Sequence, residues 1–131
     1  MASDHTNPQS FLPLTPFAFQ VLLALADGER HGYAIIKEVE DRSGGSVRLR
    51  TGTLYTLLQR LLEQELIVEP GVSALSRNVA PGGPAARADS RRRYYQLTAL
   101  GDAVLRAEAQ RLEGLIGDAR RKHVLSDAGG V

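Results

Sequence analysis

The sequence predicts a mainly α-helical fold with one small β-hairpin, and three observations favour it. Three helical segments with apolar faces follow one another between residues 14 and 64. Two short β-rich runs then flank a loop that is rich in proline and glycine. A final helical segment with its own apolar stripe occupies residues 98–122. The 131 residues form one domain that is long enough to bury a core.

The N-terminal part predicts a flexible arm followed by a buried helix. Residues 1–13 are polar and contain two prolines, so we expect an arm there. Thr15 and Pro16 are typical of a helix start, with Thr at the N-cap and Pro in the first turn. Residues 17–26 are apolar almost all round, and Asp27 and Gly28 end the segment. Such a helix is buried on several sides, either in its own domain or against a partner.

Two further helices are expected before the hairpin. The second runs from about His31 to Arg42, and Ser43–Ser46 is a clear breaker. The alternating residues Val47–Leu49 fit a very short strand. Thr51 is then expected to cap the third helix, which runs to about residue 64.

The hairpin and the last helix complete the pattern. The β-rich runs 66–68 and 93–97 are joined by a long loop over residues 70–92. Thr98 caps the last helix, whose first turn carries an acid that suits the helix dipole, and residues 123–131 read as a disordered tail. Three helices followed by a hairpin are the winged helix-turn-helix, expected over residues 14–97 and followed by a separate C-terminal helix.

The composition excludes some kinds of site, but the net charge does not indicate a class of protein. Lys and Arg number 16 against 15 for Asp and Glu, so the net charge of +1 does not itself favour a polyanionic partner. Nearly all basic residues are arginine, which suits phosphate and guanine but also fits a GC-rich genome. The absence of cysteine excludes disulfides and thiolate metal sites. No signal peptide or long apolar run is visible, so we expect a soluble cytoplasmic protein.

The third helix carries an unusual outer face. Leu54, Leu57, Leu58 and Leu61 share one side, and the opposite side carries short hydroxyls, an amide, a phenol and a guanidinium. Such groups suit base edges and phosphate oxygens. An ordinary amphipathic helix is the alternative for this segment.

The hairpin loop adds a charge asymmetry, since residues 77–93 carry five arginines against one acid, a net charge of +4 (5 − 1). A solvated loop with incidental charge is the alternative there.

Four sequence blocks together resemble the PadR family of transcriptional regulators. They are Leu14-Thr15-Pro16, His31-Gly32-Tyr33-Ala34-Ile35, Gly52-Thr53-Leu54-Tyr55 and Arg93-Tyr94-Tyr95-Gln96-Leu97-Thr98 with Gly101. The resemblance covers roughly residues 14–112, and only the combination of blocks is specific. The family commonly has proline after the Leu-Tyr pair, where this chain has Thr56. With a single helix after the hairpin, the chain is similar to the short branch of the family.

The resemblance implies a homodimeric, double-stranded DNA-binding regulator, usually a repressor, that is released in some relatives by small aromatic or drug-like compounds. The expected DNA contacts are Tyr33, Thr51, Thr53, Tyr55, Thr56, Gln59, Arg60, Arg77, Arg87, Arg91, Arg92 and Arg93. The last helix would dimerise against the first helix of the partner, through Phe17, Phe19, Leu22, Leu100, Val104, Leu112, Leu115 and Ile116. The alternatives are that Tyr55 is half-buried packing, that His31 is a simple helix cap, which we favour, and that both helices fold back onto one monomer.

Other functions find little support in the sequence. We see no paired carboxylates, no nucleophile beside a base, no phosphate-binding glycine loop and no metal-ligand spacing, so we expect neither an enzyme nor a cofactor. The main rival to a DNA-binding regulator is a winged helix that binds another protein without specific DNA binding.

Overall fold

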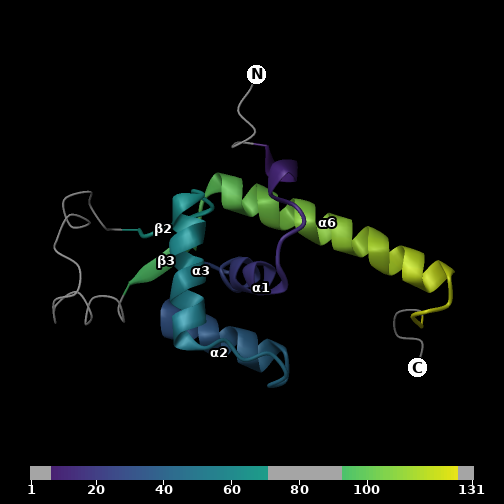
Figure 1. Cartoon of the computed structure of the whole chain (residues 1–131), viewed down its shortest axis with the longest axis horizontal. Coiled ribbons are helices and arrows are strands. Elements are labelled where there is room, and N and C mark those ends of the chain that lie inside the picture. Colours follow the sequence, from purple (N-terminus) through teal and green to yellow (C-terminus); the bar gives the residue numbers. More distant parts are fainter. Residues whose placement is uncertain (1–6, 71–92, 127–131) are drawn as a thin grey trace.

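A computed structural model describes residues 7–70 and 93–126 of the chain. It contains a short 3-10 helix, four α-helices and a small antiparallel sheet, so the predicted mainly helical winged fold is confirmed (Figure 1). The elements, in order, are η2 (Pro8–Phe11), α1 (Pro16–Ala24), β1 (Arg30–His31), α2 (Gly32–Arg42), α3 (Thr51–Glu63), β2 (Ile67–Val68), β3 (Tyr94–Leu97) and α6 (Ala99–Arg121).

Three of the helices begin at side-chain caps that the sequence predicts. The Oγ1 atom of Thr15 accepts the backbone N–H of Ala18 at 3.2 Å, before α1. The Oγ1 atom of Thr98 accepts the N–H of Gly101 at 2.9 Å, before α6. His31 caps α2, because its Nδ1 accepts the N–H of Ala34 at 3.3 Å. Each bond satisfies one backbone donor that the first helical turn leaves without a partner.

The sheet contains one strand that the sequence does not predict, β1, and one expected strand is wrong. Its strand order is β1-β3-β2, with Arg30 opposite Tyr95 and Ile67 opposite Leu97. Residues 47–49 form no strand. They follow a turn in which the Oγ atom of Ser43 accepts the N–H of Val47 at 3.0 Å, and they serve to bury Leu49 in the core.

The N-terminal segment also differs from the flexible arm that the sequence predicts. Within its described part, residues 7–11 form the cap and body of η2, and this short helix packs against α6. The backbone N–H of Leu14 donates to the Glu108 carboxylate of α6 at 3.1 Å. Apolar side chains of the segment, Phe11 and Leu12 among them, pack against the core. The segment is therefore held on α6 by both polar and apolar contacts.

The core lies where the three N-terminal helices meet the sheet and the start of α6. Its fully buried members include Leu22 of α1, Ile35 of α2, Leu58 of α3 and Val104 of α6. Burying each such side chain contributes about 1.5–3 kcal/mol. The one-sided apolar stripes of α2 and α3 thus find the partners that their sequence pattern requires.

The start of α6 is fixed to the turn between α3 and β2. The Thr98 hydroxyl donates to the carbonyl oxygen of Glu65 at 2.7 Å, and its backbone N–H donates to the carbonyl of Leu66 at 3.1 Å. Gly101 approaches the Leu66 carbonyl so closely that a Cβ atom there would overlap it. The buried residues of α6 all lie between 101 and 108, and its C-terminal half projects from the body (Figure 1).

Candidate nucleic-acid interface

Helix α3 presents the outer face that the sequence predicts. Leu54, Leu58 and Leu61 are buried, whereas the polar side chains on the other side are exposed. The predicted contacts that are exposed on this helix are Thr51, Thr53, Thr56, Gln59 and Arg60. Hydroxyl, amide and guanidinium groups on one exposed helix face can donate to and accept from base edges in a major groove.

The start of α3 differs from the prediction, because Thr51 is its first helical residue and not its cap. Arg50 occupies the cap position, and its side chain accepts no hydrogen bond from the first turn. The N–H groups of that turn therefore have no side-chain acceptor, and they carry the positive end of the helix dipole. This arrangement suits a phosphate oxygen.

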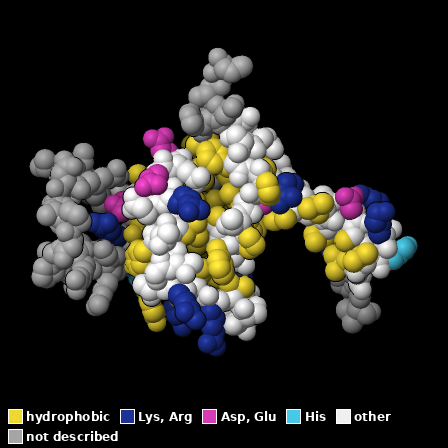
Figure 2. Space-filling view, viewed as in Figure 1, with side chains coloured by type: hydrophobic (Ala, Val, Ile, Leu, Met, Phe, Trp, Pro, Cys, Tyr) yellow, Lys and Arg dark blue, Asp and Glu magenta, His cyan; other side chains and the backbone are white. Residues whose placement is uncertain are grey.

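Two exposed arginines beside this helix start were missing from the predicted contacts. Arg48 and Arg50 both lie in the turn between α2 and α3, and neither forms an ion pair within residues 7–70 and 93–126. Figure 2 shows Lys and Arg side chains gathered at the end of the molecule where α2 and α3 meet. The signal in the sequence was the alternation of residues 47–50, apolar inward and basic outward, which we interpreted as a strand.

Of the two predicted tyrosine contacts, one is well exposed and the other is partly packed. Tyr33, in the first turn of α2, is 65% exposed. Tyr55 is half-buried and packed against the core, and its hydroxyl lies so close to Gly32 that a side chain at that position would displace it. The packing alternative considered for Tyr55 therefore describes its position better than an outward contact does.

The base of the hairpin holds a buried acid beside an arginine. Glu69 follows β2, and its Oε2 lies 3.6 Å from an Nη1 of Arg93, which precedes β3. Burial, with a further contribution from the Glu69 carboxylate, raises the pKa of Tyr95 to about 12. The other predicted hairpin contacts, Arg77, Arg87, Arg91 and Arg92, lie outside the described residues.

The predicted dimerisation residues fall into two groups. Phe17, Leu115 and Ile116 are 41%, 51% and 42% exposed, so a partner could cover them. Leu22 and Val104 are fully buried within their own chain. For these two the prediction is wrong, because a side chain with no exposed surface cannot contact a second molecule. Phe19, Leu100 and Leu112 are half-buried.

The described residues offer neither a metal site nor a membrane-spanning helix. Residues 7–70 and 93–126 contain no cluster of three His, Asp or Glu side chains that could hold a metal ion. Over the same residues, no helix is both long and apolar enough to cross a membrane.

The fold and the face of α3 define a class of protein, the winged helix-turn-helix transcriptional regulators with a C-terminal helix. Within this class, the model of the transcriptional regulator PadR-like family matches residues 21–79. An uncharacterized protein of Lysinibacillus sphaericus is 33% identical over 85 residues, which are 65% of this chain and 67% of that protein. The chain belongs to the PadR family.

Solved structures have the same fold. A PadR family transcription regulator from Clostridium difficile R20291 is 24% identical, with a TM-score of 0.60 over 85% of this chain and 100% of that one. RosR of H. salinarum, in the hsRosR-SG complex, is 27% identical, with a TM-score of 0.55 over 93% of this chain and 89% of that one.

Proposed function

We propose that the protein is a homodimeric, sequence-specific DNA-binding transcriptional regulator that acts as a repressor. The observation that carries the proposal is the exposed polar face of α3, with Thr53, Thr56, Gln59 and Arg60 on the side away from the buried leucine stripe. These side chains would read base edges in the major groove. Arg48, Arg50 and the first turn of α3 would bind phosphates beside them. The repressor role is taken from the family resemblance.

A fluorescence-anisotropy titration tests the proposal. The probe is a duplex from directly upstream of the gene, compared with a shuffled duplex, at two salt concentrations. We expect at least about a 10³-fold preference for the upstream duplex. If each protomer of a dimer neutralises ~4 phosphates, the slope of log K against log salt is roughly −7. Equal, weak and salt-insensitive binding to both duplexes would contradict the proposal and favour a protein-binding winged helix.

A double variant separates these two functions. Gln59→Ala with Arg60→Ala removes an amide and a guanidinium from the exposed face of α3, and a DNA reader then loses the upstream duplex but keeps its dimer. The matched control is Arg106→Ala with Gln110→Ala, which removes the same two groups from exposed positions of α6. The control should leave DNA binding within about twofold of wild type.

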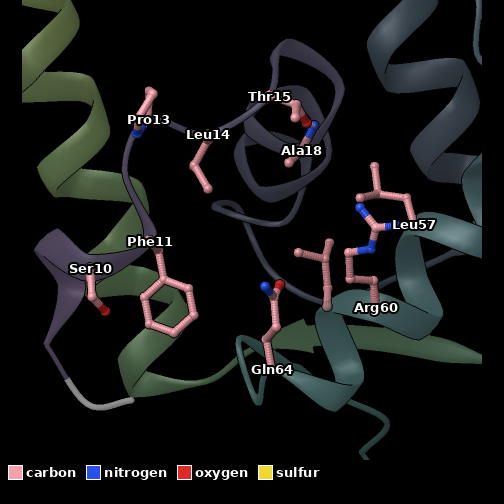
Figure 3. A pocket seen from close by; sticks show the side chains of 10 residues that line it. Ser10, Phe11, Pro13, Leu14, Thr15, Ala18, Leu57, Arg60 and Gln64 are labelled. Carbon is pink, nitrogen blue, oxygen red and sulfur yellow. Dashed lines mark hydrogen bonds between the residues drawn. The ribbon is translucent and has the colours of Figure 1, made fainter. Parts of the chain in front are cut away.

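Release by a small-molecule effector is a second part of the proposal. A cavity of about 580 Å³ lies between the N-terminal segment and α3. Figure 3 shows Phe11 and Leu14 on one side of it and Arg60 and Gln64 on the other. Apolar walls with one guanidinium suit an aromatic anion, and Arg60 would then be withdrawn from DNA.

A competition experiment tests effector release. Benzoate, titrated into the complex with the upstream duplex, is expected to lower the anisotropy of the wild type. Gln64 is exposed, so Gln64→Trp should narrow the cavity without disturbing the core, and it should leave the complex insensitive to benzoate. Equal release from both proteins would place the effector elsewhere.

A further inference from the structure

The predicted DNA contact Arg93 lies beside a buried carboxylate. Glu69 is only 5% exposed, and its Oε2 lies 3.6 Å from Arg93 Nη1, whose side chain is 39% exposed. The two residues flank residues 71–92, since one follows β2 and the other precedes β3. The ion pair therefore joins the two sides of the predicted wing at its base, where the described residues end.

An arginine in this position is not free to bind phosphate. If the guanidinium moved to DNA, Glu69 would remain as a buried charge without its cation, which is strongly unfavourable. A phosphate drawn close to the pair would in addition face the Glu69 carboxylate, and like charges repel strongly where little water screens them. Arg48 and Arg50 differ from Arg93, because they are exposed and have no carboxylate partner among the described residues.

The strands connect this ion pair to the DNA-reading helices. β3 is the central strand, paired with β2 on one side and with β1, which leads directly into α2, on the other. Tyr95 of β3 is buried within reach of the charge of Glu69 and of the Tyr55 ring of α3. Tyr55 in turn packs against Gly32 at the start of α2. A displacement of the Glu69–Arg93 pair would therefore be transmitted to α3 through Tyr95 and Tyr55.

We propose that Arg93 is a positioning residue, which neutralises Glu69 and holds the ends of the wing in register with α3, and that it is not a phosphate contact. This inference rests on the proposed function and replaces the sequence prediction for this arginine. On this proposal Arg48, Arg50 and Arg60 bind DNA directly, whereas Arg93 orients the wing relative to α3.

The salt dependence of DNA binding distinguishes the two roles. Each lost phosphate contact reduces the slope of log K against log salt by about 0.9, or about 2 for a dimer. We expect Arg93→Gln to weaken binding of the upstream duplex about tenfold with an unchanged slope. Glu69→Gln with Arg93→Gln removes both charges and leaves two amides that can pair, so it should restore affinity to within about threefold of wild type. Arg50→Gln serves as the comparison and should reduce the slope.

Three results would overturn the positioning role. They are a reduced slope in Arg93→Gln, unchanged affinity in that variant, or a double variant that binds as weakly as the single one. Should Arg93→Gln not fold, the double variant decides through its slope, which is that of wild type only if Arg93 binds no phosphate. If the wild-type protein does not distinguish the two duplexes, the proposed function itself fails, which is a different outcome from the other three.

Discussion

Glu108 is a buried carboxylate that links two distant parts of the chain. It lies on α6 at 1% exposure, accepts the N–H of Leu14 at 3.1 Å, and receives two hydrogen bonds from Arg111 at 2.6 and 2.9 Å. Its bonds from Arg111 lower its pKa, against the effect of burial, and the Leu14 bond lowers it further. The carboxylate therefore stabilises the N-terminal segment on α6 as an anion.

Replacing this acid should destabilise the fold in a pH-dependent way. Glu108→Gln is expected to reduce the free energy of unfolding by about 1.5–3 kcal/mol near neutral pH, because charged hydrogen bonds are lost. The folded pKa lies below the ordinary value of 4.5, so the contribution of Glu108 is complete above that pH and disappears as the pH falls through the folded pKa. The difference between wild type and variant should therefore narrow in acid.

Urea unfolding of both proteins, near neutral pH and again in acid, measures this difference. Glu113→Gln is the matched control, because Glu113 is exposed on the same helix, and it should change stability by less than about 0.5 kcal/mol. A Glu108→Gln variant as stable as wild type near neutral pH would show that the buried carboxylate does not hold the segment.

The residue scale also marks where prediction from sequence ends. The exposed groups of α3 were predictable, because the helical period alone separates them from the buried leucines. The pairing of Glu108 with Leu14, and of Glu69 with Arg93, joins positions far apart in sequence, and no local pattern reports it. Acids on helices or beside strands are usually solvated, so nothing in the sequence sets these two apart.

At the scale of elements, most predictions that rest on local signals succeeded, although the cap expected at Thr51 was wrong because Arg50 occupies that position. The caps at Thr15, His31 and Thr98 depend on residues within a single turn, and all three were predicted. β1 has only two residues, and its partner strand is more than 60 positions away. It was missed because its pairing depends on tertiary contact. The strand expected at residues 47–49 was wrong because alternation there serves a buried turn residue, Leu49, without any pairing partner.

The uncapped start of α3 allows a test at this scale, in which stability and function move in opposite directions. Arg50 has the extended backbone of a cap residue, with φ −78° and ψ 148°, but its side chain accepts no bond. Arg50→Ser should supply the missing acceptor and raise the free energy of unfolding by about 1 kcal/mol. The same change removes a cation from the proposed phosphate site, so DNA affinity should fall and the salt slope should lose about 0.9 per protomer.

Arg48→Ser is the matched control for this test, since it removes the same charge from the same turn but not at the cap position. We expect it to weaken DNA binding in a similar way without any gain in stability. Urea unfolding and anisotropy on the same preparations give both quantities. If Arg50→Ser stabilises the fold and retains the full salt slope, Arg50 is not a phosphate contact.

At the scale of the whole molecule, the chain exposes more apolar surface than its own fold can cover. The C-terminal half of α6 projects beyond the core (Figure 1), and Leu115 and Ile116 on it are both more than 40% exposed. Phe17 of α1 is 41% exposed as well. Extended apolar surface on a small domain is typical of an interface. The predicted dimer surface wrongly included Leu22 and Val104, which are buried in the chain's own core. The apolar stripe of a helix does not by itself show which of its residues pack inside the chain and which remain exposed.

The dimer proposed from this surface can be broken at one position. Leu115→Glu places a charge on the exposed stripe of α6, and it should weaken dimerisation by at least about 30-fold, as expected for a central interface residue. Sedimentation should then give a mass near 14.2 kDa, where the wild type gives twice that value. Gln110→Glu adds the same charge at an exposed position about 140° around the helix from Leu115, and it should remain dimeric. Because Leu115 is outside the core, the far-UV circular dichroism of the variant should match that of the wild type.

A monomer should also lose the upstream duplex, since a single α3 reads only one half-site. A Leu115→Glu protein that still sediments as a dimer would contradict the proposed interface.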